Sequence, residues 1–97
     1  MPPRLSIVVP AYNEAARLGR SLQEIVRHLN DTRQPSEVIV VDDGSTDETT
    51  EIARQSLQDS DVVTTRVVRY EENRGKGYAV RLGLLEARAN IALFSDA

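Results

Sequence analysis

Four short apolar runs constrain this chain more than any other feature of its sequence. Leu5–Val9, Val38–Val41 and Ile91–Phe94 are almost entirely apolar, while the third run, Thr64–Arg69, mixes apolar and polar side chains. Nearly continuous apolar runs of this length are typical of strands covered on both faces, as in a parallel sheet. The mixed run is more typical of an edge strand. The runs therefore predict four strands of one parallel sheet.

Helical patterns separate these runs. The first places Leu18, Leu22 and Leu29 on one face, and Asn13 is a candidate cap at its start. The second opens on a capping-box pattern at Ser45–Glu48. Strands and helices thus alternate along the chain, which predicts a Rossmann-like α/β fold with right-handed crossovers.

The third helical pattern runs from about Gly77 to Ala89. It places Tyr78, Leu82 and Leu85 on one side, which we expect to face the sheet. Gly83 is unfavourable inside a helix, and we expect it to permit close packing on the sheet.

Composition excludes several classes of function. The 97 residues fit one domain, include no cysteine and only one histidine, and carry a net charge of −3. Disulfides and cysteine- or histidine-rich metal sites are therefore excluded, and bulk charge does not favour nucleic acid. No apolar run approaches the roughly 20 residues of a membrane span, and the start does not resemble a signal peptide. We expect a cytoplasmic chain without a nucleic-acid partner or membrane span.

Turn-forming and acidic residues gather after the predicted strands. In open α/β sheets, ligands bind outside the carboxyl ends of the strands. The segments in that position are 10–14, 42–47, 71–77 and 95–97. In the first of them, Tyr12 suits stacking on a base or packing at the turn, and Glu14 is at least a first-turn acid. The clustering predicts a binding site on this rim.

Two adjacent acids, Asp42 and Asp43, end the second apolar run. Asp47 and Glu48, a few residues later, are explained by the dipole of the following helix. Asp42 and Asp43 precede the expected cap, and a carboxylate there suits hydrogen bonds from a nucleobase or ribose. We therefore expect a binding role for at least one of these two.

Two cations, Arg74 and Lys76, alternate with glycines before the third helical pattern. Such a segment suits either a solvated turn or the neutralisation of a diphosphate near a helix N-terminus. Gly75-x-Gly77 also begins a dinucleotide fingerprint, but Val80 replaces its third small residue and the motif does not follow the first strand. Asp96 is either a polar residue leaving the sheet or the first acid of a metal-binding D-x-D pair.

Taken together, these segments resemble the motifs of family 2 glycosyltransferases, in order and at normal spacing. The matching segments are 5–14, 38–47, 73–77 and 94–97, and the Arg-Gly-Lys-Gly stretch is most similar to dolichyl- or polyprenyl-phosphate glucosyltransferases. The resemblance implies a GT-A fold with strand order 3-2-1-4 and an uncovered fourth strand. It implies that residues 1–97 form a partial domain, the nucleotide-sugar-binding half, cut at the D-x-D motif.

The resemblance also implies roles for individual residues. Those expected to bind the nucleotide are Pro10, Ala11, Tyr12, Glu14, Asp42, Asp43, Arg74 and Lys76, and Asp96 is expected to hold Mg²⁺ or Mn²⁺. The implied reaction transfers a sugar, glucose for this subgroup, from a donor such as UDP-glucose to a lipid phosphate with inversion. The catalytic base is expected downstream, so this chain alone is expected to be inactive. The full-length protein is expected at the cytoplasmic face of a membrane.

Two alternatives remain open from the sequence. One is a dinucleotide-dependent oxidoreductase domain, and the other is a non-catalytic nucleotide-binding module. Binding of NADH without binding of UDP would favour the first alternative.

Overall fold

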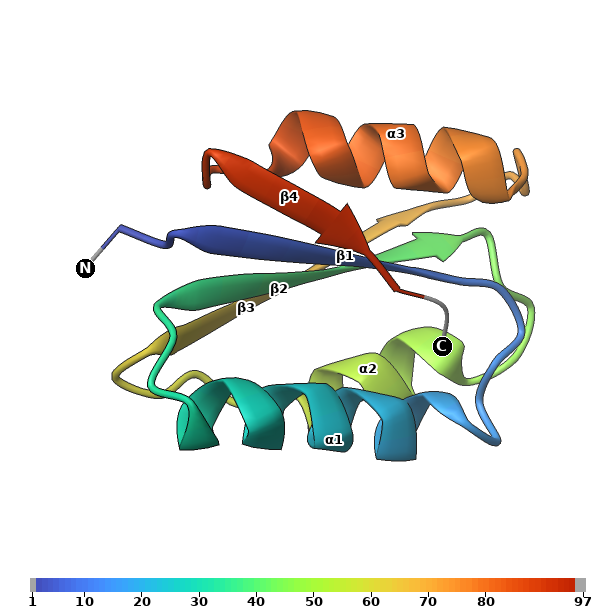
Figure 1. Ribbon diagram of the computed structural model, residues 1–97. Coiled ribbons are helices and arrows are strands. Elements are labelled where there is room, and N and C mark those ends of the chain that lie inside the picture. Colours follow the sequence, from blue (N-terminus) through green and yellow to red (C-terminus); the bar gives the residue numbers. More distant parts are fainter. Residues whose placement is uncertain (1, 96–97) are drawn as a thin grey trace.

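A computed structural model describes residues 2–95 and contains one parallel sheet between two layers of helices (Figure 1). The strands are β1 (Leu5–Ala11), β2 (Ser36–Asp43), β3 (Val63–Tyr70) and β4 (Ile91–Phe94). Their order across the sheet is β3-β2-β1-β4, and each neighbouring pair is parallel. This confirms the predicted α/β class and strand order, with the mixed run at one edge.

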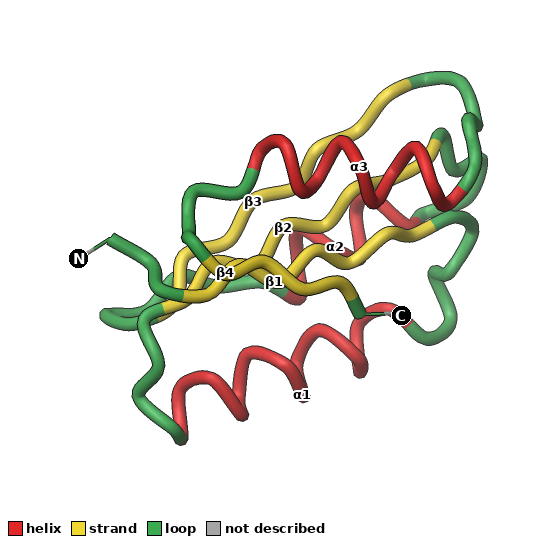
Figure 2. Tube along the Cα trace, turned by 45° about the horizontal axis from the view of Figure 1, so that its top comes forward, coloured by secondary structure: helices red, strands yellow, loops and turns green. Residues whose placement is uncertain are grey.

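The helices cover the two faces of the sheet unequally. Helices α1 (Leu18–Asp31) and α2 (Thr49–Ser56) lie on one face, and α3 (Lys76–Glu86) lies alone on the other (Figures 1 and 2). The carboxyl ends of β1 and β2 therefore open between two helical layers, which is where the sequence predicts a ligand site.

Burial on both faces explains the continuous apolar runs. In β2, Val38 and Val40 pack in the core beneath α1 and α2, whereas Ile39 and Val41 pack on the α3 side. All of them are fully buried. Successive side chains of a strand point to opposite faces, so a strand covered twice needs apolar residues at consecutive positions.

Helix α3 packs on the sheet mainly through small residues, and the expectation for its buried side was right for Leu82, which packs against the core, and wrong for the other two residues. Tyr78 and Leu85 are 44% and 74% exposed, while Ala79 and Gly83 are buried against the sheet. A Cβ atom at position 83 would lie only 2.3 Å from Cγ1 of Val8. The expected close approach at Gly83 is therefore present, while Tyr78 and Leu85 lie exposed.

Replacing Gly83 with alanine is expected to lower the free energy of unfolding by about 1–3 kcal/mol, because the new methyl group overpacks the contact with Val8. Urea unfolding of the two proteins would measure the difference. Gly77 provides a matched control, since a Cβ atom there meets nothing within 4 Å. Equal stabilities for the two alanine variants would contradict the close packing.

Two predicted helix caps were wrong, and their residues instead join two loops. Helix α1 begins at Leu18, and the Asn13 side chain accepts a hydrogen bond from the Thr46 amide at 2.9 Å. Helix α2 begins at Thr49, and the Ser45 hydroxyl accepts one from the Asn13 amide at 2.9 Å. Asn13, which makes both contacts, has a positive φ of 51°. The β1–α1 and β2–α2 loops are thereby fixed to each other beside the strand ends.

Strand β4 lies at the other edge of the sheet, as predicted. Ile91, Leu93 and Phe94 are exposed large apolar side chains on this strand. Within residues 2–95, no helix has the length and hydrophobicity needed to cross a bilayer.

Candidate functional site

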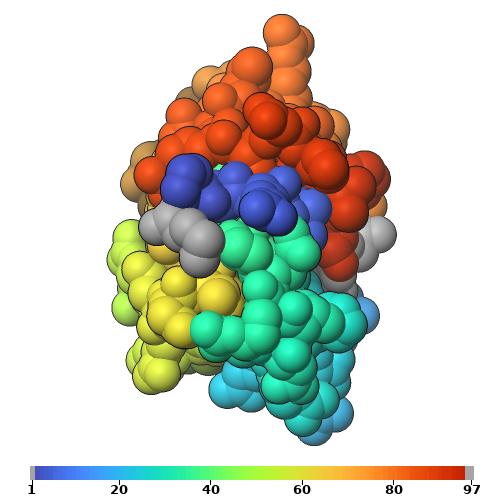
Figure 3. Space-filling view, turned by 60° about the vertical axis from the view of Figure 1, so that its left-hand side comes forward, coloured from blue at the N-terminus to red at the C-terminus, as the bar shows by residue number. Residues whose placement is uncertain are grey.

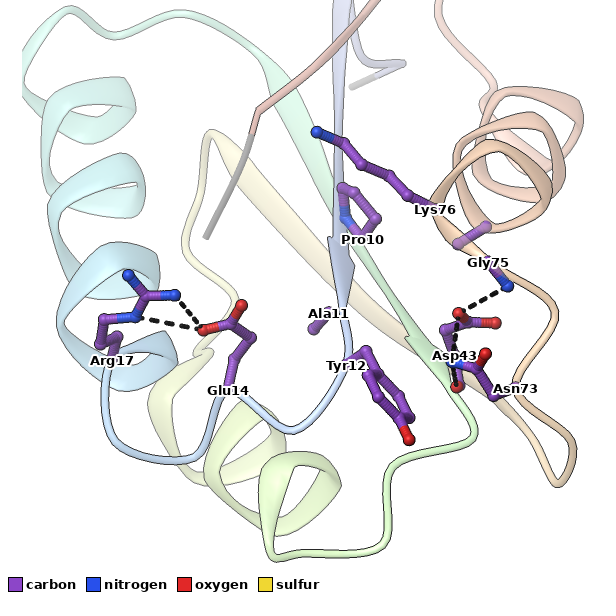
Figure 4. Close-up of a pocket in the computed structure, with 10 residues that line it drawn as sticks. Pro10, Ala11, Tyr12, Glu14, Arg17, Asp43, Asn73, Gly75 and Lys76 are labelled. Atoms are coloured by element: carbon purple, nitrogen blue, oxygen red, sulfur yellow. Dashed lines mark hydrogen bonds and ion pairs between the residues drawn. The ribbon is translucent and has the colours of Figure 1, made fainter.

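A cleft of about 600 Å³ opens at the carboxyl ends of β1 and β2 (Figure 4). Its lining residues are Pro10, Ala11, Tyr12, Glu14, Arg17, Asp43, Asn73, Gly75, Lys76 and Ala79. They come from the end of β1, the loop after it, the end of β2, the β3–α3 connection and the first turn of α3. The structure thus brings together segments that are separated by tens of residues in the chain.

Most of the predicted site residues line this cleft. Those that do are Pro10, Ala11, Tyr12, Glu14, Asp43 and Lys76. Asp42 and Arg74 lie close by but do not line it, and Asp96 falls outside the described residues. The positions agree with the predicted rim, while the binding role of each residue stays a prediction.

Glu14 and Arg17 form one wall of the cleft. The Arg17 guanidinium donates two hydrogen bonds to Oε2 of Glu14, at 2.7 and 3.2 Å (Figure 4). The Glu14 amide donates to the Thr49 hydroxyl at 2.9 Å, which holds this wall to the start of α2. Both side chains reach solvent, so this wall offers a carboxylate and a guanidinium to a ligand.

Asp43 forms the opposite wall with the β3–α3 loop. Its Oδ1 accepts hydrogen bonds from the Tyr70 hydroxyl and, at 2.8 Å, from the Arg74 amide. Its Oδ2 accepts from the Asn73 side chain at 2.8 Å and from the Gly75 amide at 2.9 Å. Figure 4 shows Asp43 with Asn73 and Gly75 on one side of the cleft and Tyr12 facing them.

Tyr70 remains a hydrogen-bond donor over the whole range of ordinary pH. Burial raises the pKa of its hydroxyl above the usual range, and the neighbouring Asp43 carboxylate raises that pKa further. Sequence reasoning did not identify Tyr70 as part of the site.

Asp42 is fully buried on the other face of β2. Its carboxylate accepts hydrogen bonds from the Ser45 amide at 3.0 Å and from the Thr50 hydroxyl, and Nε of Arg69 lies 3.9 Å away. These contacts shape the β2–α2 turn. The structure places Asp42 beneath the site rather than in the cleft.

The two cations of the β3–α3 segment point in different directions. The Arg74 guanidinium lies 5.2 Å from the centroid of the Tyr78 ring, away from the cleft lining. Lys76 extends into the cleft, and its Nζ lies 5.6 Å from the centroid of the Phe94 ring on β4 (Figure 4). Lys76 is therefore the cation of this segment that a ligand in the cleft would meet.

Sequence reasoning missed four lining residues. They are Arg17, Asn73, Gly75 and Ala79. Asn73 and Gly75 lie in the segment 71–77, whose glycines and cations already indicated a ligand site, so the sequence could have identified both. Nothing in the pattern marked Arg17, whose place in the cleft depends on how the β1–α1 loop folds.

No group of three or more acidic or histidine side chains that could hold a metal ion occurs among residues 2–95. The predicted metal ligand, Asp96, lies beyond this part of the chain. A single carboxylate is a suitable oxygen ligand for Mg²⁺ or Mn²⁺, but does not by itself make a site.

Comparison with known sequences assigns these motifs to one family. The family model described as glycosyl transferase family 2 matches residues 6–97. A human dolichyl-phosphate beta-glucosyltransferase is 41% identical over 99 residues, covering 97% of this chain and 31% of that protein. The protein of the same name from Drosophila melanogaster is 44% identical over 98 residues, covering 96% and 30%. The chain therefore spans about a third of the length of these curated relatives.

Solved structures share the fold. A mannosyltransferase from Pyrobaculum calidifontis in complex with GDP-Man and Mn²⁺ has a TM-score of 0.71 and 32% identity, covering 99% of this chain and 28% of its own. Glucosyl-3-phosphoglycerate synthase from Mycobacterium tuberculosis, in complex with Mn²⁺, UDP-glucose and phosphoglyceric acid, has a TM-score of 0.75 and 31% identity. In that comparison 97% of this chain and 33% of the other are covered.

Proposed function

The chain belongs to glycosyl transferase family 2, and we propose that it forms the nucleotide-sugar-binding part of a glucosyltransferase that acts on a polyprenyl or dolichyl phosphate. The donor in this proposal is UDP-glucose, and the sugar is transferred with inversion at the anomeric carbon. The membership leaves the dinucleotide-dependent oxidoreductase alternative without support.

The cleft at the strand ends carries this proposal. Most of its lining residues are drawn from the same motifs that resemble the family, and identity to dolichyl-phosphate beta-glucosyltransferases extends along almost the whole chain. Relatives of known structure hold GDP-Man or UDP-glucose together with Mn²⁺. A nucleoside diphosphate sugar therefore suits this cleft better than any other class of ligand.

The charges of the cleft suit the parts of such a donor. Tyr12 offers an exposed ring for a base, and Lys76 offers a cation to the diphosphate. Asp96 would be one oxygen ligand for Mg²⁺ or Mn²⁺, an ion that would supply positive charge beside the diphosphate. The lipid phosphate acceptor is already anionic and needs little deprotonation. The proposal includes the expectation that the full-length protein works at the cytoplasmic face of a membrane, where it would meet a lipid acceptor.

Isothermal calorimetry of the full native chain with UDP-glucose and Mn²⁺ is expected to show saturable binding. GDP-mannose should bind more weakly, and NADH should not bind. The transfer step is tested by incubating the protein with polyprenyl phosphate and labelled UDP-glucose, extracting the lipid and measuring the label that it carries. Binding of NADH in the absence of any UDP-glucose binding would overturn the proposal.

A further inference from the structure

Strand β2 carries a buried acid near each end, and both acids face helix α3. Glu37 and Asp43 are an even number of residues apart, so their side chains lie on the same face of the strand. Glu37 bonds to the Arg88 amide at 2.5 Å just after α3 ends, and Asp43 bonds to the Arg74 and Gly75 amides just before α3 begins. The two carboxylates thus hold both connections of this helix.

The spacing of the acids matches the helix that they hold. Six residues of strand span roughly 20 Å, and an 11-residue helix such as α3 is roughly 16 Å long. The apolar contacts of α3 come from few residues: Ala79 and Gly83 are buried, Leu82 packs partly buried against the same cluster, and Leu84 and Leu85 are exposed. The hydrogen bonds at the two ends of α3 therefore help to fix its position along β2.

The Asp43 carboxylate has no acceptor position left for a ligand in this structure. Two carboxylate oxygens offer about four lone-pair positions. The Tyr70 hydroxyl, the Asn73 amide group and the Arg74 and Gly75 backbone amides fill all of them. Asp43 is only 3% exposed, although it lines the cleft. A nucleobase donor would have to displace one of these four partners.

We propose that Asp43 acts in nucleotide binding as a positioning residue: its four hydrogen bonds hold the β3–α3 loop so that Lys76 reaches the diphosphate part of the cleft. The proposal rests on the proposed function for the identity of the ligand. Gly75 is the residue before α3 and Lys76 is its first residue, so a loop that leaves Asp43 carries Lys76 with it.

The approach of the two segments is close enough to make this coupling tight. A Cβ atom at Gly44, directly after Asp43, would lie 2.6 Å from the Asn73 backbone nitrogen and 2.8 Å from the Glu71 carbonyl oxygen. Gly44 also has a φ of +70°, which few other residues adopt readily. The end of β2 and the β3–α3 loop thus meet backbone to backbone, without flexible side chains between them.

Tyr70→Phe tests the proposal because it removes one donor to Asp43 and keeps the ring. If Asp43 positions the loop, UDP is expected to bind the full native chain several-fold more weakly, while uridine, which lacks phosphates, keeps its affinity. If Asp43 instead contacts the base directly, loss of the Tyr70 hydroxyl frees a lone pair of Asp43 Oδ1 to accept a hydrogen bond from the base. Uridine and UDP would then both bind as well as before or more tightly. NMR titration measures both ligands, including weak binding.

Hydrogen exchange provides a second measurement that needs no ligand. In Tyr70→Phe and in Asn73→Ala, the Arg74 and Gly75 amides are expected to exchange roughly tenfold faster, since fewer bonds hold the loop to Asp43. Asn73 lies on an exposed loop, so its variant remains informative even if the Tyr70 variant does not fold.

Tyr78→Phe is the matched control. Tyr78 packs edge-to-face on Tyr70 with ring centroids 5.3 Å apart, and in the described chain its hydroxyl donates no hydrogen bond to Asp43. This variant should leave the UDP affinity and the loop exchange unchanged. Unchanged exchange in both test variants, or an equal change in uridine and UDP affinity, would overturn the positioning role. Failure of the unmodified protein to bind UDP would instead contradict the proposed function, and the exchange data would then decide the role of Asp43 in holding the loop.

Discussion

Replacing Glu37 with alanine is expected to lower the free energy of unfolding by about 2–5 kcal/mol, because one buried and one partly buried donor lose their acceptor. Those donors are the Ser6 hydroxyl, 2.6 Å from Oε2 of Glu37, and the Arg88 amide, 2.5 Å from the same oxygen. The Ala89 amide in turn donates to Ser6 at 3.2 Å. Figure 3 shows this edge of the molecule, where the start of the chain (blue) lies against the C-terminal segment (orange and red).

Chemical denaturation measures this loss. Glu24→Ala is a suitable control, since it removes the same side chain from an exposed position on α1. A loss of similar size in both variants would show that the buried network around Glu37 adds nothing to stability. A loss confined to Glu37 is expected to come with faster hydrogen exchange in the α3–β4 turn.

The same network gives stability a dependence on pH. Burial alone would raise the pKa of Glu37, but hydrogen bonds from Ser6 and Arg88 outweigh it and lower the pKa. The carboxylate therefore contributes fully above the ordinary glutamate pKa of about 4.3, and the contribution is lost as the pH falls through the lower folded value. Between pH 7 and pH 3, Glu37→Gln should lose less stability than the unmodified protein. Other carboxylates of lowered pKa, such as Asp47, titrate in both proteins and cancel.

The fold was predictable because parallel sheets need apolar residues on both faces. The ends of β2 could not be predicted, because their buried residues are polar and find their hydrogen-bond partners only in the folded protein. These residues are Ser36, Glu37, Asp42 and Asp43. Strand propensity and apolar runs carry no information about such partners. The observed strand is therefore longer than the apolar run that predicted it.

The site shows a similar limit. Adjacent strand residues point to opposite faces, so the sequence implies that Asp42 and Asp43 have different surroundings. It does not show which face opens to the cleft, because that depends on where α2 and α3 lie. Arg17 could not be found for a related reason: its place in the cleft follows from the positive φ of Asn13 and from the loop contacts that Asn13 makes.

Replacing Lys76 with glutamate is expected to weaken UDP binding by about 30- to 100-fold, equivalent to about 2–3 kcal/mol, because it puts a carboxylate where the diphosphate needs a cation. Lys76 projects from the start of α3 into the cleft and lies over Phe94 at the end of β4. Glu14 and Asp43 already give the cleft two carboxylates. Uridine, which carries no phosphate, should bind both proteins alike. Titrations with UDP and uridine at 0.1 M salt measure the two affinities.

Arg81→Glu separates a local effect from a change in overall charge. Arg81 lies on the same helix, is exposed and does not line the cleft, yet its replacement changes the net charge by the same amount. Long-range charge effects are screened beyond roughly 10 Å at 0.1 M salt, so this control should bind UDP almost normally there. Equal losses of UDP affinity in the two variants would mean that Lys76 acts only through the net charge of the protein. A loss confined to Lys76→Glu, and only for the ligand with phosphates, would place the diphosphate beside the start of α3.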